Sequence, residues 1–374
     1  MNAKHPLLSI IITSYTMDRF KDICDLFDSI KNQTLMEIHR DSMEIKSPNL
    51  SQSLPISTSS PIEVIFVAER SKELYEKVKE KGREIFGNVV EIGGDSVEIH
   101  RDLMEIHRDS TETQSSNLNK SQQISINHKV LFNDGEPGLS AARNLGIKHA
   151  QGDIIAFVDD DVVLFPNWAE EVIKGFDDES IIGVTGPALP LWEDEKSMSW
   201  FPEEFYWIIS CTAWFDCNEK REVRNAWGMN MAFKKEAFEL CGLFRNEYGF
   251  HKGLFAEDNE FSLRVKAKTG KKIIFCPEMR LWHRVHKYRI SLKFIKERAY
   301  WIGRSRRNLK RTYRGNKDLL SPEHALLRRI IIRLFWDILK DLVRSPVIVW
   351  RKVCTTFVVL FFVTLGYCCL FKKK

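Results

Sequence analysis

Along the first half of the chain, the pattern of apolar and polar residues predicts strands and helices in alternation. Short apolar runs have the length of buried strands, and the segments between them carry apolar residues at helical spacing. The expected strands are 9–15, 62–67, 129–132, 154–158 and 271–276, and the expected helices are 18–31, 72–86 and 138–150. Because strand and helix alternate, the pattern predicts an α/β fold with a mostly parallel sheet flanked by helices.

Two polar segments, 36–57 and 97–125, interrupt this rhythm and are rich in Ser, Asn and Gln. Both contain a seven-residue unit, Met-Glu-Ile-His-Arg-Asp-Ser, at 36–42 and 104–110, with a near-copy that differs at its first and last residues at 97–103. The unit has too few apolar positions to form a coiled-coil seam. We therefore interpret the segments as insertions in surface loops, which cost little stability. Their repeated histidines are expected to be solvated rather than to bind metal.

The C-terminal region has a different pattern. Residues 353–371 contain no charged side chain, and a helix of this length reaches about 28 Å, close to the ~30 Å hydrocarbon core of a bilayer. We predict a membrane helix there. Residues 316–352 mix apolar and basic positions as an amphipathic interfacial helix does, until Pro346 breaks it. The preceding 1–315 would form one α/β domain. Basic residues flank the span on both sides, so charge does not set its orientation.

Composition adds limited constraints. The 56 basic and 51 acidic residues give a net charge of +5, which is too mild to indicate nucleic acid. The basic excess gathers in 298–314, which could face phosphates or anionic lipid heads, or could be an ordinary solvated helix face. The eight cysteines form no CxxC pair and no secretory signal precedes them, so we expect reduced thiols in a protein that faces the cytosol.

Three adjacent acids, Asp159, Asp160 and Asp161, follow the apolar run 154–158 directly. In open α/β sheets, ligands bind at the carboxyl ends of the strands. Three neighbouring carboxylates repel one another, so a cation is expected, and Mg²⁺ typically uses one or two carboxylates plus substrate phosphates. Taken alone, the triplet could also be a solvated acidic turn.

Five motifs in order resemble the family 2 glycosyltransferases of the GT-A fold. The resemblance covers roughly residues 7–290, apart from the two insertions. Its motifs are Thr13-Ser14-Tyr15, Ala68-Glu69, Gly138 to Asn144, Asp159-Asp160-Asp161 and Glu257-Asp258. It implies transfer of a sugar from a nucleotide-sugar donor.

The resemblance implies a metal site for the leaving diphosphate. Asp161 would be a metal ligand, Asp159 would contact the ribose or the metal, and Asp160 would lie on the donor side. Mg²⁺ or Mn²⁺ would act as a Lewis acid. His283 is a candidate for the metal or diphosphate, although a lone histidine is more often structural, and Arg289 is a candidate phosphate contact.

It also implies residues that bind the nucleotide. Thr13 and Tyr15 lie where the family's first loop meets the nucleoside, and Tyr15 could stack on the base or pack on the core. Glu69 stands where the family usually has an aspartate, and a uracil-type base remains our expectation. Arg143 could bind phosphate, or could pair with Asp159 and order the site.

The transfer itself needs a base, which the resemblance assigns to Asp258, with Glu257 bonding acceptor or donor hydroxyls. The alternative is a helix N-terminus that favours acids through its dipole. Trp227 could stack on a sugar or belong to the core. Asn230 lies in the same segment, which approaches donor sugar and acceptor in the family.

We therefore expect a membrane-attached, metal-dependent, inverting enzyme with a UDP-linked donor. Its acceptor would be a polyprenyl- or dolichyl-phosphate-linked saccharide or another glycan, at the cytosolic membrane face. The C-terminal region and the Asn230-Met231 segment also resemble glucosyl-dolichyl-phosphate glucuronosyltransferases. Two alternatives stay open, a metal-dependent phosphohydrolase or nucleotidyltransferase and a non-catalytic membrane scaffold of the same fold.

Overall fold

A computed structural model describes most of the chain outside the polar segments. Its described residues are 7–34, 62–87, 126–212, 218–248, 256–313 and 345–368, with six single positions between 327 and 340. The predicted insertions 36–57 and 97–125 lie outside the described residues. Most of the predicted amphipathic region 316–352 does too.

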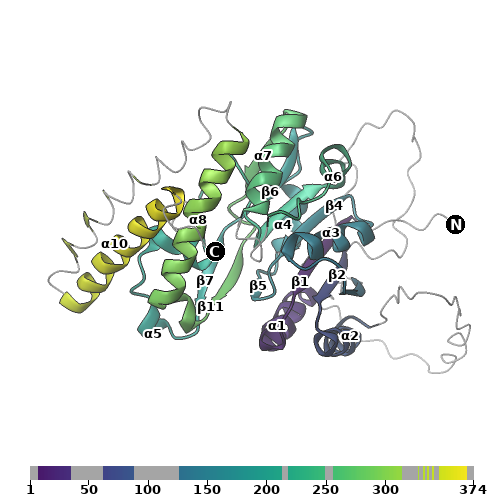
Figure 1. Ribbon diagram of the computed structural model, residues 1–374. Coiled ribbons are helices and arrows are strands. Elements are labelled where there is room, and N and C mark those ends of the chain that lie inside the picture. The colour runs from purple at the N-terminus through teal and green to yellow at the C-terminus, as the bar shows by residue number, and fades with distance from the viewer. Residues whose placement is uncertain are drawn as a thin grey trace, which may run out of the picture.

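The elements follow the predicted alternation closely (Figure 1). The strands are β1 (Leu8–Ser14), β2 (Ile62–Glu69), β3 (Ile126–Asn133), β4 (Ile154–Val158), β5 (Val162–Leu164), β6 (Ile181–Thr185), β7 (Ala188–Trp192), β8 (Arg221–Val223), β9 (Asn230–Lys234), β10 (Lys272–Phe275) and β11 (Leu281–Val285). The α-helices are α1 (Phe20–Lys31), α2 (Lys72–Phe86), α3 (Leu139–His149), α4 (Trp168–Lys174), α5 (Glu195–Met198), α6 (Lys235–Cys241), α7 (Glu257–Thr269), α8 (Leu292–Thr312) and α10 (Pro346–Cys368). Short 3₁₀ helices are η1 (Met17–Arg19), η3 (Glu203–Ile209) and η5 (Lys287–Ile290).

The large sheet has the order β3-β2-β1-β4-β9-β6-β10-β8. Strands β3, β2, β1 and β4 are parallel, so their carboxyl ends share one edge. Strand β9 runs antiparallel between β4 and β6, and β8 pairs antiparallel with β10. The α/β, GT-A-type architecture with a mostly parallel sheet is therefore confirmed.

Successive side chains along each strand point to opposite faces of this sheet, and both faces are packed with apolar residues. Ile10 and Ile12 of β1 pack on one face with Phe27 of α1, whereas Ile11 points to the other face. There Phe157 and Phe261 join a cluster that α3, α6 and α7 cover. Because both faces are buried, the central strands are apolar throughout, which explains the continuous apolar runs in the sequence.

A second sheet, of order β5-β11-β7, continues the chain just after the acidic triplet. Strand β11 runs antiparallel to β5, and His283 stands opposite Val162 in the register. The backbone N–H of Arg284 also donates to the carbonyl of Asp161 at 2.9 Å. The small sheet therefore fixes β11 beside the triplet.

The C-terminal helices α8 and α10 run side by side (Figure 1). A Cβ built on Gly303 would come within 2.0 Å of the Val363 carbonyl, and one on Gly366 within 1.9 Å of the Tyr300 carbonyl, so the two backbones touch. Among the described residues, α10 is long and apolar enough to cross a membrane. It begins at Pro346 rather than at the predicted 353, because proline suits the first turn of a helix.

Candidate active site

The carboxyl end of β4 delivers Asp159 and Asp161 beside His283 of β11. One ligand atom from each of these side chains lies within 4.8 Å of the others. His283 is fully buried, and its Nδ1 lies 3.1 Å from the Arg284 carbonyl. If Nδ1 carries the proton toward that carbonyl, the Nε2 lone pair faces the carboxylates, 3.3 Å from Asp161 Oδ1. Nε2 has no hydrogen-bond partner among the described residues, so the donor set fits a divalent cation.

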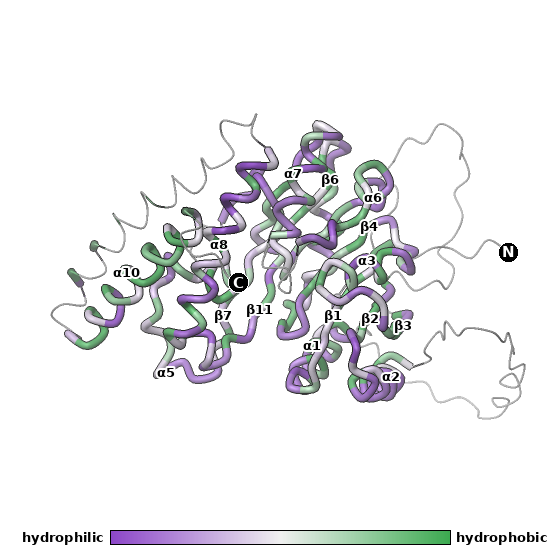
Figure 2. Tube along the Cα trace, viewed as in Figure 1, coloured by the Kyte–Doolittle hydropathy of each residue, from purple (hydrophilic) through white to green (hydrophobic). Residues whose placement is uncertain are grey.

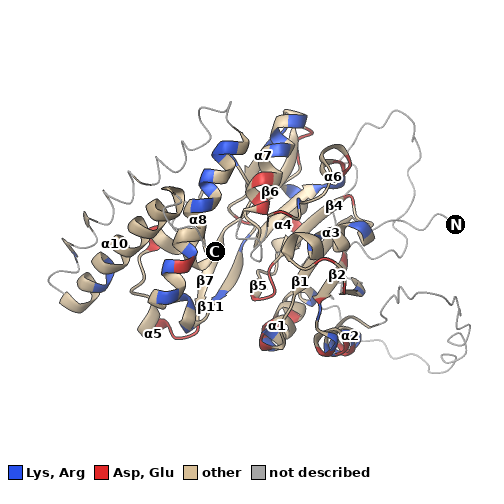
Figure 3. Ribbon diagram, viewed as in Figure 1, with Lys and Arg blue, Asp and Glu red and all other residues tan. Residues whose placement is uncertain are grey.

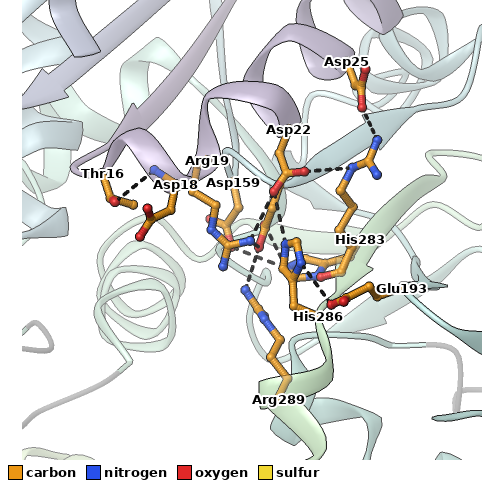
Figure 4. Close-up of polar contacts among 12 residues, drawn as sticks. Thr16, Asp18, Arg19, Asp22, Asp25, Asp159, Glu193, His283, His286 and Arg289 are labelled. Carbon is orange, nitrogen blue, oxygen red and sulfur yellow. Dashed lines mark hydrogen bonds and ion pairs between the residues drawn. The ribbon is translucent and has the colours of Figure 1, made fainter. Parts of the chain in front are cut away.

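Two arginines approach the same carboxylate from different elements. Arg289 of η5 donates from Nη2 to Asp161 Oδ2 at 2.6 Å, and Arg19 of η1 lies 3.4 Å from the same oxygen. Figure 4 shows the two guanidinium groups converging beside Asp159 and His283. Although burial opposes it, the charge of Asp161 raises the pKa of Arg19 and Arg289, so both stay cationic. They suit the negative charge of a diphosphate.

The electrostatics of the triplet are those of crowded acids. Burial and then the neighbouring Asp161 charge raise the pKa of Asp160 to about 7. At Asp159, burial also opposes ionisation, but the polar interaction with the His283 ring and the charge of Arg143 outweigh it and lower the pKa. A bound cation would relieve the repulsion within the triplet.

Arg143 of α3 connects the two acidic clusters. Its Nη1 donates to Glu257 Oε1 at 2.9 Å, and its Nη2 lies 3.5 Å from Asp159 Oδ1. The guanidinium also stacks near Phe157 and Phe244, each 5.8 Å from the ring centroid. Of the two roles foreseen for Arg143, the structure shows the pairing with Asp159. The triplet and Glu257-Asp258 therefore belong to one site.

Asp258 lies in the first turn of α7, where the helix dipole favours a carboxylate. Its Oδ2 accepts from the Gly228 N–H at 2.9 Å and its Oδ1 from the Asn259 N–H at 2.7 Å. Burial, followed by the charge of Asp258, raises the pKa of the adjacent Glu257. Ala256, before the helix, has a φ of 102°, which costs strain in a non-glycine residue.

The predicted nucleotide-side residues gather at the ends of β1 and β2. Thr13 is half-buried, and Tyr15 is 72% exposed, so Tyr15 does not pack on the core. Glu69 accepts a hydrogen bond from the Gly138 N–H at 2.7 Å, which ties β2 to the start of α3. A base contact by Glu69 stays a prediction.

Two other predicted residues make contacts within the protein, and stacking of Trp227 on a sugar stays a prediction. Trp227 packs edge-on against Phe275, with ring centroids 5.8 Å apart. Asn230 is fully buried: its Oδ1 accepts from Trp168 Nε1, and its Nδ2 donates to the carbonyls of Pro187 and Met279. All three hydrogen bonds lie within the protein. The structure thus gives Asn230 a packing role at the start of β9, and this departs from the expected ligand contact.

The model of the family described as glycosyl transferase family 2 matches residues 107–242. This range includes α3, the acidic triplet and β9. The chain carries a family 2 glycosyltransferase domain. The glycosyltransferase is 24% identical, over 343 residues, to a glucosyl-dolichyl phosphate glucuronosyltransferase of Haloferax volcanii, with 91% of this chain and 88% of that protein covered.

Two further comparisons fit this assignment. Over 168 residues the glycosyltransferase is 24% identical to the succinoglycan biosynthesis protein ExoM of Rhizobium meliloti, with 45% of this chain and 51% of that protein covered. Its fold matches a solved mannosyltransferase, PcManGT from Pyrobaculum calidifontis, in complex with GDP-Man and Mn²⁺. That match has a TM-score of 0.53 and 14% identity, and covers 98% of this chain and 88% of the other.

Sequence reasoning missed Arg19 and Arg298 of this glycosyltransferase. Arg19 precedes α1 and reaches Asp161 only because η1 turns the chain back over the sheet edge. The pKa of Arg298 is lowered overall, mainly by burial and then by the nearby Arg289 charge. The charges of Glu257, Asp159 and Asp258 act in the opposite direction, so this α8 residue lies near both acidic clusters. The basic run 298–314 was the available signal, but no pattern in it singled out Arg298.

Proposed function

We propose that this glycosyltransferase moves a sugar from a UDP-linked donor, with inversion and with Mg²⁺ or Mn²⁺ as cofactor. The observation that carries the proposal is Arg143, which holds Asp159 and Glu257 in one site. A candidate cation site and a candidate base therefore act on the same substrate. The GDP-Man and Mn²⁺ with which PcManGT forms its complex support a nucleotide-sugar donor and a metal.

In this proposal Asp159, Asp161 and His283 hold the cation, which supplies Lewis-acid stabilisation of the departing diphosphate when bound. Arg289 and Arg19 add positive charge on the same side. The acceptor oxygen attacks the anomeric carbon, and the bond from that carbon to the diphosphate oxygen breaks. The nucleoside diphosphate leaves with the electron pair, and the hydroxyl proton passes to Asp258. Attack opposite the leaving group inverts the configuration.

For the acceptor, we propose a saccharide linked to dolichyl or polyprenyl phosphate, with glucuronosyl transfer to glucosyl-dolichyl phosphate as the specific candidate. The Haloferax relative, similar over 91% of this chain, supports it. The apolar helix α10 supports a membrane location, with the catalytic domain on the cytoplasmic side and one C-terminal anchor.

The test offers purified enzyme UDP-glucuronic acid, UDP-glucose and GDP-mannose, each with Mn²⁺, Mg²⁺ or a chelator. Glucosyl-dolichyl phosphate in detergent is the acceptor. We expect transfer from a UDP donor that needs both metal and acceptor, and a product of inverted anomeric configuration by NMR. Release of nucleotide at the same rate without acceptor would favour the hydrolase alternative, and no turnover with any donor would favour the scaffold.

A further inference from the structure

The face of α10 that turns away from the protein is a stripe of large apolar side chains. Trp350, Phe357 and Phe361 are 68%, 70% and 50% exposed, and Val347 and Val353 flank them. Positions 350, 353, 357, 361 and 364 recur at helical spacing and are all exposed. Figure 2 shows α10 as a largely hydrophobic helix at the edge of the molecule.

The opposite face of α10 is fixed to the catalytic domain. Thr355, Val359 and Gly366 are buried. Val359 packs in a cluster with Phe205 and Ile295, and Gly366 meets the Tyr300 backbone of α8. The helix is therefore held along its length by the domain rather than standing apart from it.

The partner helix α8 cannot enter a bilayer core. It carries eight Lys or Arg and a single Glu in 21 residues, and Figure 3 shows positive charge along it. It is also tied to the active site, because Arg306 Nη1 donates to Asn259 Oδ1 at 2.9 Å, next to Asp258. An arginine moved to the middle of a bilayer loses its hydration, which carries a large free-energy cost.

We propose that α10 lies in the plane of the membrane surface, with its Trp350–Phe357–Phe361 stripe among the lipid chains, and does not span the bilayer. The inference rests on the proposed membrane association. A spanning α10 would carry the α8 residues at the Gly303 contact, with Arg304 and Arg307 beside it, into the hydrocarbon. In the plane, those cations instead meet anionic headgroups while the stripe is buried.

Lipid is the occupant that the charge pattern favours. Arg351 and Lys352 directly follow Trp350 on α10, and the strongly basic helix α8 packs beside α10, so positive charge lies next to the apolar stripe, which suits anionic headgroups. Before α10 in the sequence, Ile332, Phe335, Trp336 and Leu339 are also about half exposed or more.

The test measures depth in the bilayer at three positions of α10. Full-length variants Trp350→Cys, Phe357→Cys and Phe361→Cys are labelled with a fluorophore. In their background, serine replaces the native cysteines that react in the folded enzyme. Each is bound to sealed vesicles of phosphatidylglycerol and phosphatidylcholine and quenched by nitroxide lipids of graded depth. We expect one shallow depth for all three positions. A spanning helix would separate positions 350 and 361 by about 16 Å.

A graded depth, or no quenching at any position, overturns the proposal, and the latter points to another occupant such as a second copy. Binding itself is checked by vesicle co-sedimentation of Phe357→Glu, which we expect to fall at least about tenfold, against Leu240→Glu. Leu240 is an exposed apolar residue on α6, at 60%, and serves as the matched control. Transfer assayed in detergent is independent of both readouts, so its failure would count against the proposed function instead.

Discussion

Asp161 carries the densest set of polar contacts in the candidate site. His283, Arg289 and Arg19 all reach its carboxylate. Two cationic side chains on one buried carboxylate leave its negative charge balanced without a metal. A divalent ion therefore has to compete with Arg19 and Arg289 for Asp161. Once the ion has displaced them, the two arginines would be available to bind the donor diphosphate.

For Asp161→Asn we expect Mn²⁺-dependent donor binding to weaken by about 100-fold or more, because even the outer partners of metal ligands are worth about 10- to 100-fold. Titration calorimetry with UDP and Mn²⁺ measures it. Asp177→Asn, on an exposed carboxylate that pairs with Lys220, is the control and should bind as the wild type does. Unchanged binding in the Asp161 variant would remove this residue from the metal site.

For Asp258→Asn we expect kcat to fall by about 10²–10⁴-fold, the usual contribution of a general base, while donor affinity stays close to normal. Steady-state kinetics and donor titration separate the two effects. Since both Asp258 oxygens accept backbone N–H groups, thermal unfolding must show an intact fold. Near-normal turnover in a folded variant would exclude Asp258 as the base.

At the scale of elements, strand β3 holds a histidine in an apolar setting. His128 is fully buried between Phe27 and Phe86, and neither ring nitrogen has a hydrogen-bond partner among the described residues. Burial lowers the pKa of His128 to about 4, below the unfolded value near 6.5. The folded state thus holds the neutral ring, and protonation favours unfolding.

We expect the stability that depends on His128 to be complete above pH 6.5 and to decline as the pH falls toward 4. The total loss should be about 3 kcal/mol, from the size of the pKa shift. His128→Leu should flatten this part of the pH profile, which urea unfolding from pH 4 to 8 measures. An unchanged slope in the variant would show that other groups cause the acid sensitivity.

The sequence predicted the strands and helices that carry the site better than it predicted the contacts between their side chains. Strand β4 and the triplet at its end follow from an apolar run that stops at Asp159, a local signal. The pairing of Asp161 with His283 depends on the β5–β11 register, which joins residues more than a hundred positions apart. Arg19 likewise meets Asp161 only through a turn. Neither contact produces a repeating pattern of residues from which the sequence could predict it.

At the scale of the whole molecule, the long polar segments enter the described fold at one side. Residues 35–61 end where β2 begins, at Ile62, and residues 88–125 end where β3 begins, at Ile126. These are the amino ends of parallel strands. The candidate site lies at the carboxyl ends, at Thr13, Glu69 and Asp159.

Deletion of residues 97–125 should therefore leave kcat and KM within about twofold of the full chain. Shortening a loop changes the closure cost by only about 0.6 kcal/mol per halving of its length. Activity and thermal unfolding of the shortened enzyme measure this. Loss of folding would show that the segment contributes to the core.

Because the strands are parallel, the loops at their amino ends can change in length, whereas the loops at their carboxyl ends carry the candidate site. Duplication of the seven-residue unit adds chain where β2 and β3 begin, so extra copies change neither the spacing of the acids nor their partners. A change in the number of copies therefore leaves the acids at the opposite edge in place.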